Sequence, residues 1–354
     1  GDTDNWMWPR HTGDFSYFRI YANRDNQPAK YSPDNVPYKP KKFFKISIKG
    51  IQPNDFTLVF GYPGRTQEYL PSQAIQQIME QGDPDKIKIR DIKLGILAAD
   101  MDKDPKVRIQ YASKYANTSN AWKKWQGEVK GLRRLNAVEA KQKSEYEFKN
   151  WLEANADRKK RYGEVLPAFD KLYAQLAPLT KANDYYSEIV MRGTDIFNIA
   201  AFFEVIDARW SSFSSADQQK IQSSIGSKLD EYFNEYNQST DEKVFAALIR
   251  MYANDMRPEF LPEDFKILMS KTSKEDLIAK IYRKSIFANR AKLEQLASGL
   301  NAKKLKTLSQ DPIFKIFRSL KKHFESTVEP SFNSLQKQID ATMKTYTAGI
   351  MEMK

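Results

Sequence analysis

The first fourteen residues carry an unusual density of side chains that could bind a ligand or take part in catalysis. They supply carboxylate, amide, indole, guanidinium and imidazole groups, from Asp2, Asp4, Asn5, Trp6, Trp8, Arg10, His11 and Asp14. A carboxylate can orient a catalytic histidine, and an amide oxygen or an indole face can hold a ligand ammonium. Alternatively, Trp6 and Trp8 pack as core aromatic residues and the carboxylates cap turns. Composition alone leaves both interpretations open.

Composition excludes or disfavours other kinds of catalytic site. The chain has no cysteine, which excludes a cysteine nucleophile, a thiolate metal site and a disulfide. Its two histidines, His11 and His323, lie far apart in the sequence, and neither belongs to a metal-binding pattern. We therefore expect no catalytic metal and no cofactor. We expect His323 to be a surface or half-buried helix residue.

The formal net charge of +12 at pH 7 makes nucleic-acid binding a hypothesis to weigh. The basic residues, however, form short runs in separate segments, at 39–42, 158–161, 303–306 and 321–322. Acidic residues such as Glu153 and Glu164 lie among them, a mixture typical of solvated helix faces. We therefore expect no nucleic-acid partner. A non-catalytic helical module that binds peptides or nucleic acid is kept as the alternative function.

The backbone changes character near Gly64. Seven of the sixteen prolines fall in the first 64 residues. Alternating residues predict strands over 15–22 and 43–48, and a short apolar run predicts a third over 56–60. Three strands are too few to close a β-barrel or sandwich, so partner strands are missing from this chain or supplied elsewhere.

After Gly64 the apolar residues follow helical spacing, as in Val165, Phe169, Leu172 and Leu176. Capping boxes at Ser239 with Glu242 and at Thr272 with Glu275 predict two helix starts. Prolines at positions 105, 178, 258, 262, 312 and 330 predict breaks or first turns. With a mean helix length near 11 residues, we expect about eight to twelve helices over 66–354. The predicted fold class is mainly α, a multi-helix domain preceded by a few β-strands.

No apolar run approaches the roughly 18 residues that a membrane span needs. We therefore expect no membrane span.

Several strings of residues resemble one family of peptidases. Residues 1–16, Gly-Asp-Thr-Asp-Asn-Trp-Met-Trp-Pro-Arg-His-Thr-Gly-Asp-Phe-Ser, are similar to the signature of the bacterial serine dipeptidyl aminopeptidases, dipeptidyl-peptidase 7 and dipeptidyl-peptidase 11. The similarity continues at 39–41, 60–64, 104–115, 119–120 and 346–353. It therefore spans the whole chain, and its first motif is highly specific.

The resemblance implies a chymotrypsin-like double β-barrel with an inserted helical domain. Residues 1–65 would be a partial segment of that barrel, leaving it incomplete, and residues 66–354 would form the helical lid domain. The implied substrates are oligopeptides, from whose free N-terminus dipeptides are removed. The intact enzyme would be a homodimer in the periplasm, at the cell surface or secreted.

The resemblance also implies roles for four residues. Asp14 would be the acid of a Ser-His-Asp triad, Asn5 and Trp6 would anchor the substrate amino terminus, and Asn120 would be a further anchor on the helical domain. Two extended residues span roughly 7 Å, so an ammonium site that far from the nucleophile would release dipeptides. The stretch 119–123 is more similar to the apolar-preferring dipeptidyl-peptidase 7 branch, which predicts an apolar side chain before the cut bond.

The chain also departs from the family pattern. No Gly-x-Ser-x-Gly or Gly-[Asp/Asn]-Ser-Gly motif occurs, so no serine nucleophile is identified. The family histidine precedes the first motif, so His11, three residues before Asp14, is not taken as the general base. We therefore expect a fragment that lacks the catalytic His and Ser and is inactive by itself. The start at Gly1, without a signal peptide, suggests a processed or engineered terminus.

Overall fold

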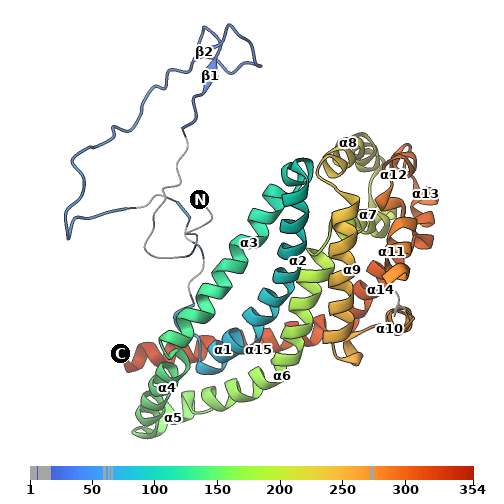
Figure 1. Cartoon of the computed structure of the whole chain (residues 1–354). Helices are drawn as coiled ribbons and strands as arrows, with labels where there is room; N and C mark the ends of the chain where they lie inside the picture. The colour runs from blue at the N-terminus through green and yellow to red at the C-terminus, as the bar shows by residue number, and fades with distance from the viewer. Residues whose placement is uncertain (1–5, 7–16, 59–60, 63, 65–66, 272–274) are drawn as a thin grey trace. The chain divides into compact units, whose positions relative to one another are not determined.

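A computed structural model of the chain describes residues 6, 17–58, 61–62, 64, 67–271 and 275–354 (Figure 1). The chain divides into two compact units. The first extends to Glu68, and the second, Tyr69–Lys354, also includes Trp6. The boundary predicted from the sequence lies after residue 65, three residues before the end of the first unit at Glu68.

The first unit has a single two-stranded ladder among its described residues. β1 (Tyr21–Ala22) pairs with β2 (Val36–Pro37) in antiparallel orientation, with Ala22 opposite Val36. Asn23 holds the turn after β1, because its Oδ1 accepts from the backbone N–H groups two and four residues later, at 3.0 and 2.8 Å.

Most of the strand predictions for this unit are wrong. Within 17–22 only the last two residues form a strand, and residues 43–48 and 56–58 form none. Their apolar side chains lie in solvent, with Phe44 99% and Ile48 97% exposed. Strand-forming residues are stabilised mainly by packing on neighbouring strands, and the described part of the chain supplies no such neighbour here. The incomplete double barrel stays a prediction.

The second unit is helical, and the mainly α fold class is confirmed. Its described residues form fifteen α-helices: α1 (Ser72–Gln77), α2 (Asp83–Lys103), α3 (Pro105–Arg134), α4 (Ala137–Glu153), α5 (Ala156–Tyr162), α6 (Val165–Tyr185), α7 (Asp195–Arg209), α8 (Ser215–Asn234), α9 (Gln238–Asp255), α10 (Glu263–Ser270), α11 (Glu275–Lys284), α12 (Arg290–Ala297), α13 (Ala302–Thr307), α14 (Pro312–Thr327) and α15 (Glu329–Met353). The number exceeds the eight to twelve expected because several helices are shorter than the mean. None of the helices described is long and apolar enough to span a membrane.

Two π-helical turns interrupt this set. η2 (Ile78–Gly82) joins α1 to α2, and η3 (Tyr186–Met191) follows α6. Such wide turns are rare and occur frequently near functional sites.

Local sequence explains where two long helices begin. Pro105 occupies the first position of α3, where its missing N–H costs nothing, and Asp104 Oδ1 accepts from the backbone N–H of Lys106 at 2.8 Å. Pro312 starts α14 in the same way, with Asp311 as the capping residue. These two prolines confirm the predicted first turns.

Other predicted boundaries are wrong. α9 is capped by Asn237, whose Oδ1 accepts from the Thr240 N–H at 3.1 Å, rather than by Ser239. Thr272 of the second predicted box lies outside the described residues. Pro178 lies inside α6 instead of ending it, because packing on α15, α1 and α2 outweighs the cost of an interior proline, about 3 kcal/mol.

One large hydrophobic core joins α2, α3, α7, α9 and α14. Its largest fully buried side chains are Tyr185, Phe197, Phe203, Phe245, Phe265, Tyr282, Phe287, Phe314 and Phe317. In Figure 1, α2 and α3 run side by side as an antiparallel hairpin, and α2 also packs on α9.

A smaller core lies where α15 packs on α4, α5 and α6. Phe148 is fully buried there and meets the Tyr346 ring edge-on, with 5.3 Å between ring centroids. A Cβ atom on Gly349 would lie 2.8 Å from Phe148 Cζ. Gly349 belongs to the closing string of the family resemblance, so this part of the resemblance has a packing explanation.

Replacing Gly349 with alanine should destabilise the chain, because the added methyl group would press on the buried Phe148 ring. We expect the free energy of unfolding, measured with urea, to fall by about 1–3 kcal/mol. Gly226→Ala in α8 is the matched control, since nothing lies within 4 Å of its added Cβ. It should stabilise the chain by roughly 0.5–1 kcal/mol. Equal effects of the two substitutions would contradict the packing assigned to Gly349.

Candidate functional site

Trp6 and Asn120, two residues of the predicted amine anchor, meet in the structure although 114 residues separate them. The Trp6 Nε1–H donates to Asn120 Oδ1 at 2.9 Å. Trp6 is 51% exposed and Asn120, on α3, also faces solvent, so a ligand can reach both. Trp6 has a φ of 61°, a left-handed conformation that is uncommon for a bulky residue and clusters at functional sites.

The hydrogen bond determines what Asn120 can do chemically. An indole N–H can only donate, so the oxygen of the Asn120 amide faces it. An amide oxygen has two lone pairs and can accept two hydrogen bonds. A ligand ammonium could donate to it while the indole face attracts the positive charge. The pair therefore suits a primary amine.

The structure does not describe the other two predicted site residues, Asn5 and Asp14. Asn5, His11 and Asp14 lie outside the described residues, so the structure brings together two of the four predicted site residues, and all four roles stay predictions. His323 is half-buried on α14, and its Nε2 lies 2.9 Å from Glu259 O. This confirms its interpretation as a helix residue.

Arg90 ties α3 to α2 beside Asn120. Its Nη1 donates to the backbone oxygen of Thr118 at 2.8 Å, and its Nε and Nη2 donate to the two carboxylate oxygens of Glu188 at 2.7 and 3.0 Å. The side chains of Arg90 and Glu188 are only 11% and 7% exposed. Sequence reasoning missed both residues because they lie 98 positions apart and belong to no local motif. Only the similarity at Ser119 and Asn120 pointed to this stretch.

Two tryptophans of α3 extend the attachment to α2. The Trp122 Nε1–H donates to Asp91 Oδ1 at 2.6 Å. The Trp125 ring centroid lies 4.5 Å from Lys86 Nζ and 4.4 Å from Arg90 Cζ, within the range of cation–π attraction. Helix α3 is thus fastened to α2 before and after Asn120 in the sequence.

A group of carboxylates lies near the two π-helical turns. Burial raises the pKa of Asp184 to about 6, with Lys86 opposing the shift and Glu188 adding repulsion. Burial also raises the pKa of Asp83 and of Asp85, and the Oδ2 atom of each is buried without a hydrogen-bond partner. Over the residues that the structure describes, no group of three or more His, Cys, Asp or Glu side chains is placed to hold a metal ion.

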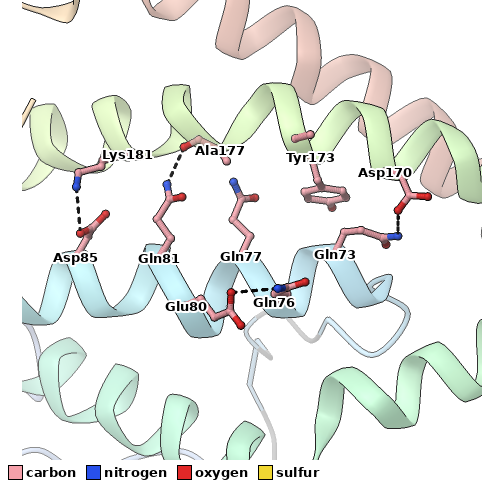
Figure 2. A pocket seen from close by; sticks show the side chains of 11 residues that line it. Gln73, Gln76, Gln77, Glu80, Gln81, Asp85, Asp170, Tyr173, Ala177 and Lys181 are labelled. Atoms are coloured by element: carbon pink, nitrogen blue, oxygen red, sulfur yellow. Dashed lines mark hydrogen bonds and ion pairs between the residues drawn. The ribbon is translucent and has the colours of Figure 1, made fainter. Parts of the chain in front are cut away.

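A groove of about 610 Å³ lies between α6 and the segment that runs from α1 into α2 (Figure 2). Polar contacts cross it, namely Gln73 with Asp170 at 2.6 Å, Gln81 with the backbone oxygen of Ala177 at 2.7 Å and Lys181 with Asp85 at 3.8 Å. Neither Trp6 nor Asn120, the two predicted site residues that the structure describes, lines this groove. Its polar groups fasten α1 and α2 to α6.

The comparisons with known proteins agree on one family. The sequence profile of Peptidase S46 matches residues 1–354. An Asp/Glu-specific dipeptidyl-peptidase of Flavobacterium psychrophilum is 39% identical over 353 residues, which cover 99% of this chain and 49% of that protein. A dipeptidyl-peptidase 7 of Porphyromonas gingivalis is 35% identical over 324 residues, which cover 90% of this chain and 44% of that protein. The chain spans about half the length of the curated relatives it matches.

Solved structures give the same result. A crystal structure of Porphyromonas endodontalis DPP11 in complex with the dipeptide Arg-Glu matches with a TM-score of 0.76 and 27% identity, covering all of this chain and 50% of that chain. The same protein in an alternate conformation matches with a TM-score of 0.59.

The expected apolar preference finds no support in these comparisons. It was based on the similarity of residues 119–123 to the dipeptidyl-peptidase 7 branch. Two relatives at 39% and 38% identity are named Asp/Glu-specific. A five-residue stretch on a helix is too short to outweigh identity over the whole chain.

The raised pKa of Asp184 predicts a pH-dependent stability. The folded-state pKa of about 6 lies above the ordinary value of 3.8, so ionisation of this buried carboxyl disfavours the folded state. This destabilisation is absent below about pH 4 and grows as the pH rises through 6. Asp184→Asn should therefore raise the free energy of unfolding by about 1–3 kcal/mol at pH 7.5 and change it little at pH 4.

The control for this measurement is Asp102→Asn, which removes an exposed pair with Arg108. It should change the free energy of unfolding by less than about 1 kcal/mol at both pH values. An Asp184→Asn stabilisation that is as large at pH 4 as at pH 7.5 would contradict the assigned titration.

Proposed function

Because the chain belongs to the Peptidase S46 family, we propose that it forms part of a serine dipeptidyl aminopeptidase that removes dipeptides from the free N-terminus of oligopeptides. The observation that carries the proposal is the hydrogen bond from Trp6 to Asn120, which brings Trp6 of the opening string against helix α3. The names of the relatives and the Arg-Glu complex of P. endodontalis DPP11 support the substrate class.

In this proposal Trp6 and Asn120, with Asn5, hold the substrate ammonium. The ammonium has three donors, and Asn120 Oδ1 offers it an acceptor whose direction is set by the Trp6 indole. Hydrogen bonds that involve a charged group are worth about 1.5–3 kcal/mol each. Two extended residues then span roughly 7 Å between this anchor and the scissile bond, so the product is a dipeptide.

We further propose that Asp14 is the acid that orients the catalytic histidine. Such a carboxylate fixes the histidine tautomer and stabilises its cationic form during acyl transfer. The histidine and serine are proposed to lie outside these 354 residues, because His11 is too close to Asp14 in sequence and no nucleophile motif occurs.

The substrate preference and cellular setting are proposed from the relatives. The two Asp/Glu-specific relatives support an acidic residue at the second position of the substrate. A homodimer acting in the periplasm, at the cell surface or after secretion is proposed on the family resemblance alone.

The amine anchor predicts that peptide binding depends on a free amino group. Arg-Glu should bind the 354-residue chain, and N-acetyl-Arg-Glu should bind at least about tenfold more weakly, because acetylation removes the ammonium. Isothermal titration calorimetry measures both affinities.

Asn120→Ala should weaken the binding of Arg-Glu about 10- to 100-fold, whereas Asn117→Ala, one turn earlier on the same exposed face, should not. Equal binding of the two peptides would contradict the anchor and favour the non-catalytic peptide-binding alternative.

Catalysis should need the longer enzyme and the Asp14 carboxylate. We expect the 354-residue chain to release no fluorophore from dipeptidyl substrates above the buffer rate. In a full-length enzyme that contains this chain, Asp14→Asn should lower kcat by about four orders of magnitude, as for the corresponding acid in chymotrypsin-type enzymes. Clear hydrolysis by the 354-residue chain, or an unchanged kcat in the variant, would refute this assignment.

A further inference from the structure

We propose that Arg90, oriented by Glu188, is a positioning residue for the amine anchor formed by Trp6 and Asn120. This inference rests on the proposed function, since it names what holds that anchor in place. The described hydrogen bonds of Arg90 and Glu188 do not include Trp6, so both residues would act through helix α3.

The guanidinium of Arg90 has little freedom to adopt another arrangement. Two of its nitrogens bind the two oxygens of Glu188, at 2.7 and 3.0 Å, and the third binds the Thr118 carbonyl at 2.8 Å. Both side chains are about nine-tenths buried. Arg90 also lies over the Trp125 ring, 4.4 Å from its centroid, which fixes the plane of the group.

The contact with Thr118 places Asn120 because the two residues lie on the same turn of α3. A shift of this turn by about 1 Å would stretch the 2.9 Å bond between Trp6 and Asn120 beyond hydrogen-bond length. The bond from Trp122 to Asp91 holds the following turn, at 2.6 Å. Asn120 therefore lies between two points at which α3 is fixed to α2.

Helix α3 needs such support because the part that follows Asn120 has a low helix propensity. Gly127 and Gly131 lie about two and three turns beyond Asn120, and each interior glycine costs a helix about 1 kcal/mol relative to alanine. An added Cβ on Gly127 would lie 3.7 Å from the Trp6 backbone oxygen, so Trp6 borders this weaker part. The contacts that hold α3 in place come from Arg90 of α2, which is itself held by Glu188 of η3.

A lysine could not replace Arg90 in this role. Lysine carries one nitrogen and can approach Glu188 or the Thr118 carbonyl, but it lacks the planar fork that binds both at once. Arg90→Lys therefore keeps the charge and removes the link to α3. Glu188→Gln keeps the shape and weakens the orientation of Arg90.

The test uses the indole N–H resonances of the ¹⁵N-labelled 354-residue chain. The Trp6 resonance is assigned by its loss in Trp6→Phe, and it reports directly on the bond to Asn120. In Arg90→Lys and Glu188→Gln we expect this resonance to move upfield and its exchange with water to accelerate about tenfold. The resonances of Trp151 and Trp210, which lie in other parts of the fold, should stay in place and show that the variants are folded.

Arg108→Lys is the matched control, because Arg108 of α3 also pairs with a carboxylate, Asp102, but makes no contact with Thr118. It should leave the Trp6 resonance unchanged. Affinity for Arg-Glu should fall about tenfold in Arg90→Lys and stay constant in Arg108→Lys.

The outcomes separate this inference from the proposed function. A Trp6 resonance and an Arg-Glu affinity that both stay unchanged in folded Glu188→Gln and Arg90→Lys would overturn the inference. If the wild-type chain does not bind Arg-Glu but the Trp6 resonance still moves in the variants, the positioning role stands and the proposed function fails. If Arg90→Lys does not fold, Glu188→Gln decides the question alone.

Discussion

One buried guanidinium joins the three elements on which the candidate site depends. Arg90 of α2 binds Glu188 of η3 and the Thr118 carbonyl of α3, and solvent reaches little of the pair. A buried ion pair contributes favourably only when its hydrogen bonds are complete, and loss of one partner costs about 3–5 kcal/mol. Moving one of these elements away while the others stay packed would leave a buried charge without its partner. The contact thus makes the arrangement specific, whatever its net contribution to stability.

The charges around this contact also bear on the nucleic-acid alternative. Lys86 pairs with Asp83 at 3.0 Å and lies over Trp125, and Arg90 is held by Glu188. Lys114 lies 2.9 Å from Asp195 in the same way. Cations that face buried carboxylates cannot also neutralise phosphates without leaving those carboxylates unpaired. Each such pair adds nothing to the net charge, so the excess of +12 belongs to other lysines and arginines of the chain.

Helical periodicity predicted the parts of the fold that local sequence determines. Val165, Phe169, Leu172 and Leu176 were expected on one helix face, and all four are buried in α6. Residues 43–48 do not form the predicted strand, because a strand depends on partner strands that local sequence does not supply. Ser239 failed as a cap because Asn237 lies two residues earlier and amides cap equally well.

The candidate site was predictable only where a family motif covered it. Trp6 and Asn120 came from the resemblance, and no periodicity or spacing would have joined them across 114 residues. Arg90 and Glu188 had no such motif. In the sequence they resemble the mixed charges of a solvated helix face, and only the packing of α2, α3 and η3 removes them from water.

The conformation of Trp6 shows why the support from α3 matters. A left-handed conformation costs a residue with a side chain roughly 1–2 kcal/mol. A neutral hydrogen bond such as that to Asn120 stabilises the folded state by about 0.5–1.5 kcal/mol. The two terms nearly cancel, so a small displacement of Asn120 would be enough to release Trp6. By thermodynamic linkage, a ligand that binds both side chains must in turn stabilise the placement of α3. In the proposed site, the affinity of the anchor would therefore depend on the geometry of the buried guanidinium.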